Sequence, residues 1–432
     1  MNGSRGLPNS CHQYVSKCKC AQCILHCKRS DFTMSTEPRI IKFFETTLRD
    51  GEQTPGVNYF PEEKLAIAQA LAEMGFDTLD CGFGASSPSE IECIRLIASK
   101  VRNAEICSIA RVNFSDIELA WEAVKDAEIP VIHPFVSTSP LHRQVKLGKT
   151  REEVLEMART AVAHARTYTE NVDFALEDST RTEHDFILEV CEAVLKEGVR
   201  FISICDTVGF ALPWEFGKLV ADVKREFPQA RISAHCHDDL GLAVANALEG
   251  LRNGAERVDS CINGLGERAG NAATEDVVMA IRTRSADLGM DVKVDTTKIT
   301  STSRLVAKLS GMQVQWTKSV VGQNAFSHGG GIHQDGVLKD ARTYEIMTPE
   351  SVGLTSADRR MHMGKLSGRA ALDAQMRELG YVLEKEQLNR AFDIAKLLLG
   401  KKKVLEEMDM RYIAEVAMGR VEVVIGSATV VE

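Results

Sequence analysis

The stretch IIKFFETTLRDGEQTPGVNYFPEEKLAIAQALAEMG, residues 40–75, joins a short apolar run to an amphipathic segment through a polar loop. IIKFFE (40–45) has the length and the β-favouring side chains of a buried strand. In PEEKLAIAQALAEMG (61–75), apolar residues from Leu65 to Met74 recur close to every 3.6 positions, which indicates a helix. A strand followed by a helix is the unit from which parallel sheets are built.

This alternation continues to about residue 288. The predicted strands are short, apolar and rich in β-branched residues, and they span 40–45, 77–83, 104–112, 129–136, 171–177, 200–206, 231–237 and 257–263. Helical patterns lie between them, and a final helix is predicted over 271–289. Eight units in about 250 residues predict a closed (β/α)8 TIM barrel of the α/β class. An open doubly wound sheet is disfavoured because no glycine-rich dinucleotide turn follows the first strand.

The chain divides into four predicted parts. Residues 1–36 form a Cys-rich leader that is expected to be disordered, and residues 37–290 form the barrel. Residues 291–415 form small helical subdomains, and residues 416–432 form a short tail. The leader holds five of the twelve cysteines, and CKCAQCILHCK offers Cys20, Cys23, His26 and Cys27 as zinc ligands. The preferred interpretation is a disordered or non-native extension, because the second, well-separated ligand pair of a zinc finger is missing.

Composition excludes several classes of protein. The 432 residues are 44% hydrophobic and 26% charged, with a net charge of −9 and no basic stripe, which argues against a nucleic-acid partner. No apolar run approaches the roughly 20 residues of a membrane span. The seven cysteines outside the leader are scattered singly, as expected for reduced thiols in the cytoplasm. The basic, acid-poor character of residues 1–33 leaves organelle targeting open.

AHCHDDLG, residues 234–241, places two histidines on what should be the seventh strand. Residues i and i+2 of a strand share a face, so His235 and His237 would lie about 7 Å apart at their Cα atoms. Asp50 could reach them from the loop after the first strand, and Asn271 could add an amide oxygen. Mixed nitrogen and oxygen ligands suit a catalytic divalent ion such as Mg²⁺, Mn²⁺ or Zn²⁺. Two hydrogen-bonded histidines in a polar corner are the alternative.

Polar residues gather where the other predicted strands end, which is the rim that carries the chemistry of such barrels. They are Arg49 and Gln53 after the first strand, His133 in the fourth, Glu177 at the end of the fifth and Thr207 after the sixth. A single polar residue at a strand end is commonly a helix cap. Convergence of several on one rim favours an active site over the polar-corner alternative.

Several long motifs resemble one enzyme family. TTLRDGEQTPG, AHCHDDLGLAVANAL, NGLGERAGNAATE, VGQNAFSHGGGIHQDGVLK and YEIMTPESVGL are similar to the 2-isopropylmalate synthase branch of the DRE-TIM metallolyases, over about residues 40–412. The resemblance implies a metal-dependent barrel with helical subdomains after it, and a homodimer with shared active sites. It implies an acyltransferase that condenses acetyl-CoA with a 2-oxo acid and hydrolyses the thioester.

The resemblance also implies residue roles. The metal site would use Asp50, His235, His237 and Asn271; catalysis would use Arg49, Glu177 and His333; the 2-oxo acid would meet Gln53, His133 and Thr207; and the acyl-CoA loop would contain Gly264, Gly266, Glu267 and Arg268. Glu177 and His333 are both candidates for the base. A salt bridge to a neighbouring carboxylate is the alternative for Arg49. Asp178, Asp238 and Asp239 are expected to orient a histidine or cap a helix. The expected cofactors are a divalent metal ion and a monovalent cation as activator.

The sequence departs from the family pattern at several positions. Glu45 and Asp80 stand where the family usually has Asp and Glu, and Ala175 stands where relatives usually carry Ser. Gly329 and Gly330 replace Glu and Ser in the HESGIHQDG type of loop. We expect these changes to alter the rim that contacts the variable group of the substrate, so the general reaction is better supported than any one 2-oxo acid.

2-Oxoisovalerate is the expected 2-oxo acid, with 2-isopropylmalate as product. Homocitrate, citramalate and methylthioalkylmalate synthesis are the alternatives within the family. Cleavage by an acyl-CoA lyase is disfavoured because the loop after the eighth strand, GLGERAGN, lacks the cysteine of such lyases. A non-catalytic ligand-binding paralogue is the remaining alternative. The 13 residues after Gly419 leave no room for a leucine-binding domain, so little inhibition by leucine is expected.

Overall fold

The computed structural model describes residues 37–421. Its barrel strands are β1 (Arg39–Glu45), β2 (Thr78–Asp80), β3 (Glu105–Arg111), β4 (Pro130–Ser137), β5 (Phe174–Glu177), β6 (Ile202–Asp206), β7 (Ile232–Cys236) and β8 (Arg257–Ser260). All pair in parallel in chain order, and β1 pairs with both β2 and β8, so the sheet is closed. The predicted (β/α)8 barrel is confirmed. The leader and its cysteines lie outside the described residues, as does the tail beyond residue 421.

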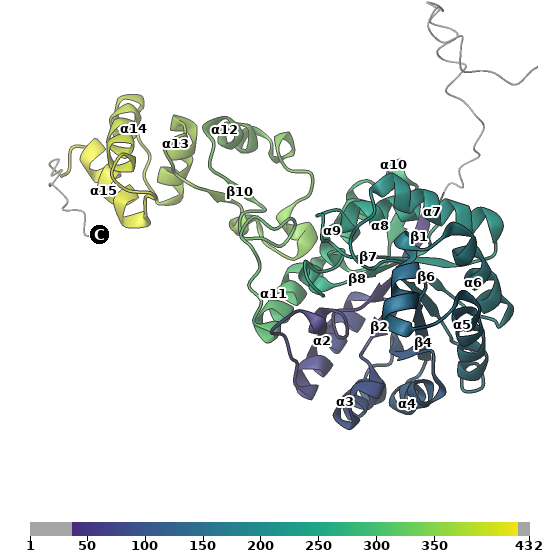
Figure 1. Ribbon diagram of the computed structural model, residues 1–432. Coiled ribbons are helices and arrows are strands. Elements are labelled where there is room, and N and C mark those ends of the chain that lie inside the picture. The colour runs from purple at the N-terminus through teal and green to yellow at the C-terminus, as the bar shows by residue number, and fades with distance from the viewer. Residues whose placement is uncertain (1–36, 422–432) are drawn as a thin grey trace, which may run out of the picture.

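The helices form the outer layer of the barrel (Figure 1). They are α2 (Pro61–Met74), α3 (Pro88–Lys100), α4 (Phe114–Val124), α5 (Arg151–Ala165), α6 (His184–Lys196), α7 (Pro213–Glu226), α8 (Ala243–Arg252) and α9 (Thr274–Thr283). Their ends follow local chemistry: α2 begins at a proline and ends before Gly75, whose φ of 89° is left-handed. Thr150 and Glu153 form a reciprocal capping box at the start of α5.

The helix predicted over 271–289 is wrong at both ends. Asn271 and Ala273 instead form bridges with His237 and Cys261, so α9 begins only at Thr274. Arg284, with a φ of −115°, separates α9 from the short α10 (Ser285–Leu288). The sequence pattern also missed β9 (Met290–Val292), which pairs with the first residues of β1. Bridges to the residues after β7 and β8 thus overrode the helical periodicity at the N-terminal end, and the backbone of Arg284 interrupts it near the other end.

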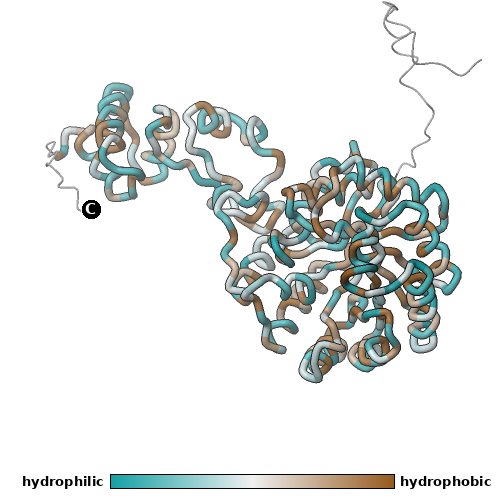
Figure 2. Tube along the Cα trace, viewed as in Figure 1, coloured by the Kyte–Doolittle hydropathy of each residue, from teal (hydrophilic) through white to brown (hydrophobic). Residues whose placement is uncertain are grey.

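A continuous hydrophobic core joins the barrel strands to the helices around them. In Figure 2 the tube is brown mainly where the strands meet, and teal on the outer helices. The interior of the barrel is more polar than this core. Arg257 is buried there, lies 2.6 Å from Asp173 and stacks on Phe44. This ion pair joins the start of β8 to the residue before β5, at the end of the barrel opposite the rim.

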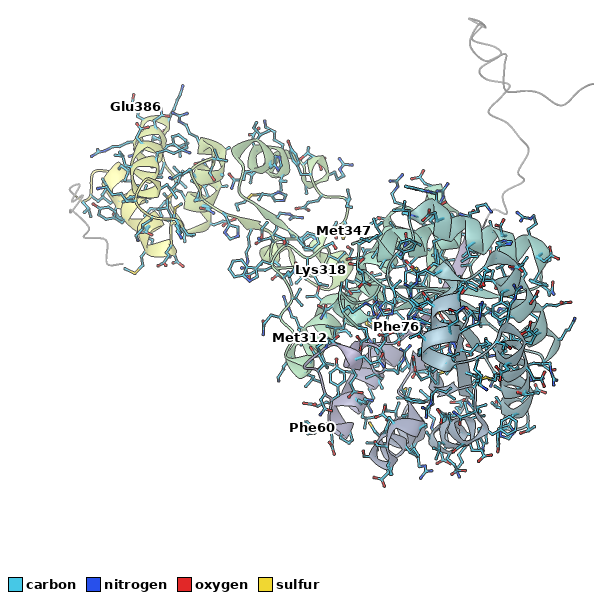
Figure 3. The ribbon with its side chains drawn as sticks, in the orientation of Figure 1. Phe60, Phe76, Met312, Lys318, Met347 and Glu386 are labelled. Carbon is cyan, nitrogen blue, oxygen red and sulfur yellow. The ribbon has the colours of Figure 1, made fainter. Side chains whose placement is uncertain are left out.

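An arm follows the barrel and extends away from it (Figure 1). It contains α11 (Ile299–Ser310), β10 (Ser327–His328), α12 (Gly331–Lys339), β11 (Arg360–Met361), α13 (Arg369–Glu378), α14 (Lys385–Leu399) and α15 (Glu407–Ala417). α11 packs against α2, whereas α13, α14 and α15 share a separate core. Lys318 and Met347 mark the neck between barrel and arm in Figure 3, and Glu386 lies at the far end. Within residues 37–421, no helix combines the length and hydrophobicity of a membrane span.

Candidate active site

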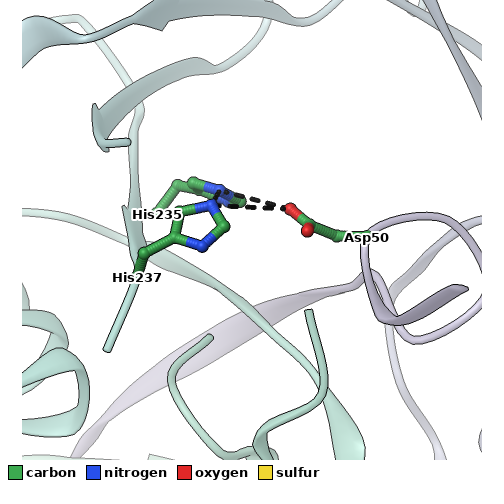
Figure 4. A group of neighbouring side chains, drawn as sticks. All are labelled: Asp50, His235 and His237. Carbon is green, nitrogen blue, oxygen red and sulfur yellow. Dashed lines mark hydrogen bonds and ion pairs between the residues drawn. The ribbon is translucent and has the colours of Figure 1, made fainter. Parts of the chain in front are cut away.

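The two histidines of AHCHDDLG converge on Asp50 at the carboxyl end of the barrel. The side chains of His235 and His237 lie on the same face at the carboxyl end of β7, and their Nε2 atoms lie 3.3 Å apart. Asp50 Oδ2 lies 3.6 Å from Nε2 of His235 and 3.8 Å from Nε2 of His237 (Figure 4). All three side chains are buried. Each of the three offers one ligand atom, and these atoms lie within 4.8 Å of one another, close enough to bind one metal ion.

The chemistry of these donors fits a divalent ion. Oδ1 of Asp50 and Oδ1 of Asn271 are buried without a hydrogen-bond partner, while Nδ2 of Asn271 donates to the carbonyl of Leu265. Burial lowers the pKa of His237 to about 4, so the ring is neutral at pH 7 and keeps a lone pair for a ligand bond. Burial alone would raise the pKa of Asp50, but Arg49 and the two histidines hold it well below its usual range. An anionic oxygen, an amide oxygen and imidazole nitrogens suit Mg²⁺, Mn²⁺ or Zn²⁺.

Asp259 orients His235. Its Oδ2 lies 3.5 Å from Nδ1 of His235, and its carboxylate accepts hydrogen bonds from Ser203 and Ser233. Fixing Nδ1 in this way turns Nε2 toward Asp50. Sequence reasoning missed Asp259, although inward-facing positions of β8 should alternate and Asp259 stands opposite His235 in the register.

The aspartates expected in that role do other work. Asp238 accepts a hydrogen bond from the backbone N–H of Ala243 and so caps α8. Helix capping is one of the two roles that the sequence predicted for it. Asp239 instead pairs with Arg268 at 2.8 Å. Asp178 has a left-handed φ of 65° and binds Arg181. Neither Asp178 nor Asp239 holds a metal-site histidine.

Arg49 bridges two buried carboxylates. Its Nε lies 2.7 Å from Asp80, and its Nη1 lies 3.0 Å from Asp50. Burial opposes its charge, but the two carboxylates raise its pKa above the ordinary value. The salt bridge that sequence analysis offered as an alternative is therefore present. It also fixes a guanidinium group beside the metal-binding side chains, in the wall of a cavity.

That cavity has a volume of about 350 Å³ and is open at the rim. Ten of the predicted site residues line it: Arg49, Asp50, Gln53, His133, Glu177, Thr207, His235, His237, Glu267 and Arg268. Ala175, one of the departures from the family pattern, also lines it, with six residues that the sequence did not single out: Phe44, Ile109, Phe135, Lys146, Cys205 and Asp259. Some of these stand two positions from a predicted residue, as Phe135 does from His133 on β4 and Cys205 from Thr207 at the end of β6. A period of two would have found them.

Glu177 is held from two sides at the end of β5. The hydroxyl of Ser137, on β4, donates to Oε2 of Glu177 at 2.5 Å. Nζ of Lys146 lies 2.6 Å from Oε1 and 2.8 Å from Oε2. The carboxylate therefore enters the cavity with both oxygens engaged. Because Lys146 lies in the loop between β4 and α5, sequence periodicity gave no signal for this contact.

His133 and Thr207 offer neutral hydrogen-bonding groups to the cavity. Both ring nitrogens of His133 are buried without a partner, and the ring meets Phe44 edge to face at 5.0 Å. Burial lowers the pKa of His133 to about 4, so this histidine is neutral at pH 7. The hydroxyl of Thr207 accepts from the backbone N–H of Asp178, which leaves its own O–H available to donate.

The glycines of NGLGERAGN shape the loop beside the metal-binding side chains. Gly266 has a φ of 147°, and a Cβ there would lie 2.1 Å from Nδ2 of Asn271. Gly264 lines a second cavity, of about 430 Å³, which Asn271 also borders. Of the four residues predicted for acyl-CoA, only Glu267 and Arg268 line the cavity that contains Glu177.

His333 lies outside this constellation. It is exposed on α12 in the arm, and its ring stacks on Tyr344 with the centroids 4.2 Å apart. It is not among the residues that line the cavity with Glu177. The family departures are also distributed unevenly: Ala175 lines the cavity, whereas Glu45 and Asp80 are buried beneath it and do not reach the space for a substrate.

The chain has known relatives along most of its length. A family model described as HMGL-like matches residues 40–306, and one described as homocitrate synthase post-HMGL domain-like matches residues 320–403. The 2-isopropylmalate synthase of Ruminiclostridium cellulolyticum is 48% identical, over 87% of this chain and 74% of that protein. The 2-isopropylmalate synthase of Pyrococcus furiosus is 46% identical, over 88% of this chain and 77% of that protein.

Solved structures support the fold. Hydroxymethylglutaryl-CoA lyase from Pseudomonas aeruginosa superposes with a TM-score of 0.57 at 21% identity, covering 64% of this chain and 95% of that chain. The HMG-CoA lyase of Brucella melitensis gives 0.55 at 20% identity, covering 63% and 99%. These structural similarities support the barrel fold alone. The family model and the sequence relatives show the family to which the chain belongs. The chain belongs to the HMGL-like family, in the branch of the 2-isopropylmalate synthases.

Proposed function

We propose that this protein condenses acetyl-CoA with a 2-oxo acid and hydrolyses the resulting thioester, as a 2-alkylmalate synthase. The proposed 2-oxo acid is 2-oxoisovalerate, which gives 2-isopropylmalate. The observation that carries the proposal is one cavity in which Asp50, His235 and His237 face Glu177. The names of the relatives support the same activity.

The first requirement is to hold and activate the keto group. Asp50, His235, His237 and Asn271 would hold a divalent ion, which when bound supplies Lewis-acid polarisation of the keto oxygen. The guanidinium group of Arg49 is held in place by Asp50 and Asp80. Its positive charge would stabilise the keto oxygen as that oxygen becomes an alkoxide. Thr207 donates to the substrate carboxylate, and Gln53 and neutral His133 line the same cavity and offer further hydrogen bonds.

The second requirement is a carbon nucleophile. Glu177 takes a proton from the methyl group of the acetyl thioester, and the electron pair of that C–H bond forms the bond to the keto carbon. The keto oxygen takes the negative charge beside Arg49 and is then protonated by water, and Glu177 releases its proton to the solvent, which restores the base. Water cleaves the thioester, which releases the CoA thiol and the 2-alkylmalate. The loop with Gly264, Gly266, Glu267 and Arg268 is the proposed contact for acyl-CoA.

The composition of the cavity wall supports an alkyl side chain on the 2-oxo acid. Phe44, Ile109, Phe135, Ala175 and Cys205 come from β1 and from the successive strands β3 to β6. The cations that line the cavity are already paired: Arg49 with Asp80, Lys146 with Glu177 and Arg268 with Asp239. No cation of the lining is left to neutralise a distal carboxylate, which disfavours the homocitrate alternative.

A homodimer with shared sites is part of the proposal. The arm exposes large apolar side chains, among them Ile332, Ile346, Leu366 and Met408, each about 80% exposed. We take these exposed apolar side chains as support for a surface that a partner covers. On the barrel rim, Val145 and Trp214 are exposed as well. We propose that the arm of one subunit covers the rim of the other and brings His333 to its cavity. A cytoplasmic location is proposed from the seven unpaired, buried cysteines of the barrel.

The test is a thiol-release assay across a panel of 2-oxo acids, with and without a chelator. Release should be fastest with 2-oxoisovalerate, should fall with 2-oxoglutarate, and should stop after thorough chelation and return with Mg²⁺, Mn²⁺ or Zn²⁺. Activity that survives chelation would contradict the metal-dependent mechanism. A thermal shift with 2-oxo acids but no thiol release from any of them would favour a non-catalytic paralogue.

A further inference from the structure

Lys146 contacts both carboxylate oxygens of Glu177. Its Nζ spans both carboxylate oxygens, at 2.6 Å from Oε1 and 2.8 Å from Oε2. The Glu177 side chain is only 19% exposed, whereas that of Lys146 is 49% exposed. Ion pairs between two exposed side chains contribute little and hold no fixed geometry. This pair differs because one partner is largely buried and is also bound by Ser137.

The backbone that carries Lys146 is anchored. His142–Leu147 forms a π-helical turn between β4 and α5, a conformation that is rare and is frequent at functional sites. Arg143 in this turn is buried, binds both oxygens of Glu183 at 2.7 and 2.9 Å, and stacks on Phe186 at 4.7 Å. Leu147 packs against the barrel core. The ammonium group is therefore brought to Glu177 by a fixed turn.

We propose that Lys146 is the positioning residue of Glu177, a role that rests on the proposed function of Glu177 as base. The carboxylate has three rotatable bonds, and the contacts to Ser137 and Lys146 select one orientation of it. They also make its oxygens unequal, since Oε2 accepts hydrogen bonds from both groups, whereas Oε1 accepts one from Lys146 and lies 3.7 Å from Nδ1 of His142. Oε1 is thus the oxygen that accepts the methyl proton, while Oε2 stays bound to Ser137.

The proposal separates two functions of the cavity, binding of the 2-oxo acid and proton transfer from acetyl-CoA. The donors around Asp50 hold the 2-oxo acid, so loss of Lys146 should leave its binding intact. Proton transfer from acetyl-CoA depends on the orientation of Glu177, so that step should suffer. Removing the ammonium group should lower kcat without raising KM for the 2-oxo acid.

The experiment compares Lys146→Met, Lys146→Arg and Lys149→Met in the full chain. Lys149 is the matched control, because it lies three residues away and pairs with Glu153 on the outside of α5. We expect Lys146→Met to lower kcat about 10- to 100-fold with KM for the 2-oxo acid within about threefold of wild type. Exchange of the acetyl-CoA methyl protons with deuterated water should slow in parallel. Lys146→Arg should recover most of the rate, and Lys149→Met should match wild type.

Crystal structures of wild type and Lys146→Met supply a readout that does not depend on turnover. The Glu177 carboxylate should leave Ser137 or become disordered in the variant. Wild-type kcat and exchange in Lys146→Met would overturn the proposal, as would a rise in KM for the 2-oxo acid with kcat unchanged. If wild type releases no thiol with any 2-oxo acid, the proposed function fails. The positioning role of Lys146 is then tested by the crystal structures alone. A Glu177 carboxylate with the same position in wild type and in Lys146→Met would overturn that role.

Discussion

The rim of the barrel and the arm differ in how complete they are within one chain. At the rim, Asp50, His235 and His237 are buried, and Arg49 and Asp259 fix two of them in place. In the arm, His333 is exposed and its ring stacks on Tyr344. One chain therefore brings the candidate metal-binding groups and Glu177 into one cavity. The arm exposes apolar and polar groups that, in the proposed dimer, the partner subunit would cover.

The largest expected loss of activity comes from a substitution among the candidate metal-binding residues of the rim. Asp50→Asn keeps the shape of the side chain but removes the anionic oxygen between the two histidines. We expect loss of divalent-ion binding and a fall in activity of more than about 10⁴-fold, because polarisation of the keto group is lost. Titration calorimetry with Mn²⁺ and the thiol-release assay measure the two effects. Asp340→Asn, on the exposed arm, should match wild type, and tight Mn²⁺ binding by Asp50→Asn would contradict the assignment.

Glu177→Gln separates proton abstraction from binding within the same cavity. The amide cannot accept the methyl proton, so kcat should fall by about 10²–10⁴-fold. The affinity for Mn²⁺ and for the 2-oxo acid should change little, since the donors around Asp50 are untouched. Steady-state kinetics together with calorimetry test both parts. An unchanged kcat would remove Glu177 from the mechanism.

Mixing two inactive chains tests whether the arm completes a partner. If His333 serves the neighbouring cavity, a dimer of His333→Ala and Glu177→Gln chains has one intact site out of two. After random subunit exchange, half the dimers are mixed, so about a quarter of wild-type activity should return. Mass spectrometry of labelled subunits must verify the exchange. Proven exchange without regained activity would place His333 in its own subunit or outside the reaction.

The smallest effect concerns stability beneath the cavity. Burial raises the pKa of Glu45 to about 7, although Thr47, Thr274 and Ile262 donate to its carboxylate. The folded state therefore holds this proton more tightly than the unfolded chain, whose glutamate pKa is about 4.3. The stability that follows is present at low pH and is lost as pH rises toward 7. Between pH 5 and pH 8 the loss from this group should be about 2–3 kcal/mol.

Glu45→Gln cannot ionise, so its unfolding free energy should lack this loss. Urea denaturation at pH 5 and pH 8 measures the difference between wild type and variant. Glu152→Gln, at an exposed carboxylate in the first turn of α5, should keep the wild-type dependence on pH. A Glu45→Gln protein with the full wild-type slope would show that other groups cause it.

The sequence by itself determined the barrel and most of its rim. Alternating strands and helices specify parallel pairing, and a period of two within each strand specifies which side chains face inward. His235 and His237 share a face for this reason. The same rule, applied two positions from His133 and from Thr207, would have identified Phe135 and Cys205. The rule works because strand geometry is local.

Only the tertiary structure decided the contacts that join distant segments. Lys146 reaches Glu177 from a loop 31 residues earlier in the chain, and Asp259 reaches His235 from the next strand. The predicted helix over 271–289 lost its first residues to pairing with β7 and β8. His333 stands apart from the cavity, although the motif around it belongs to the same family pattern as the barrel. These outcomes depend on which elements meet in space, and spacing along one chain carries no record of that.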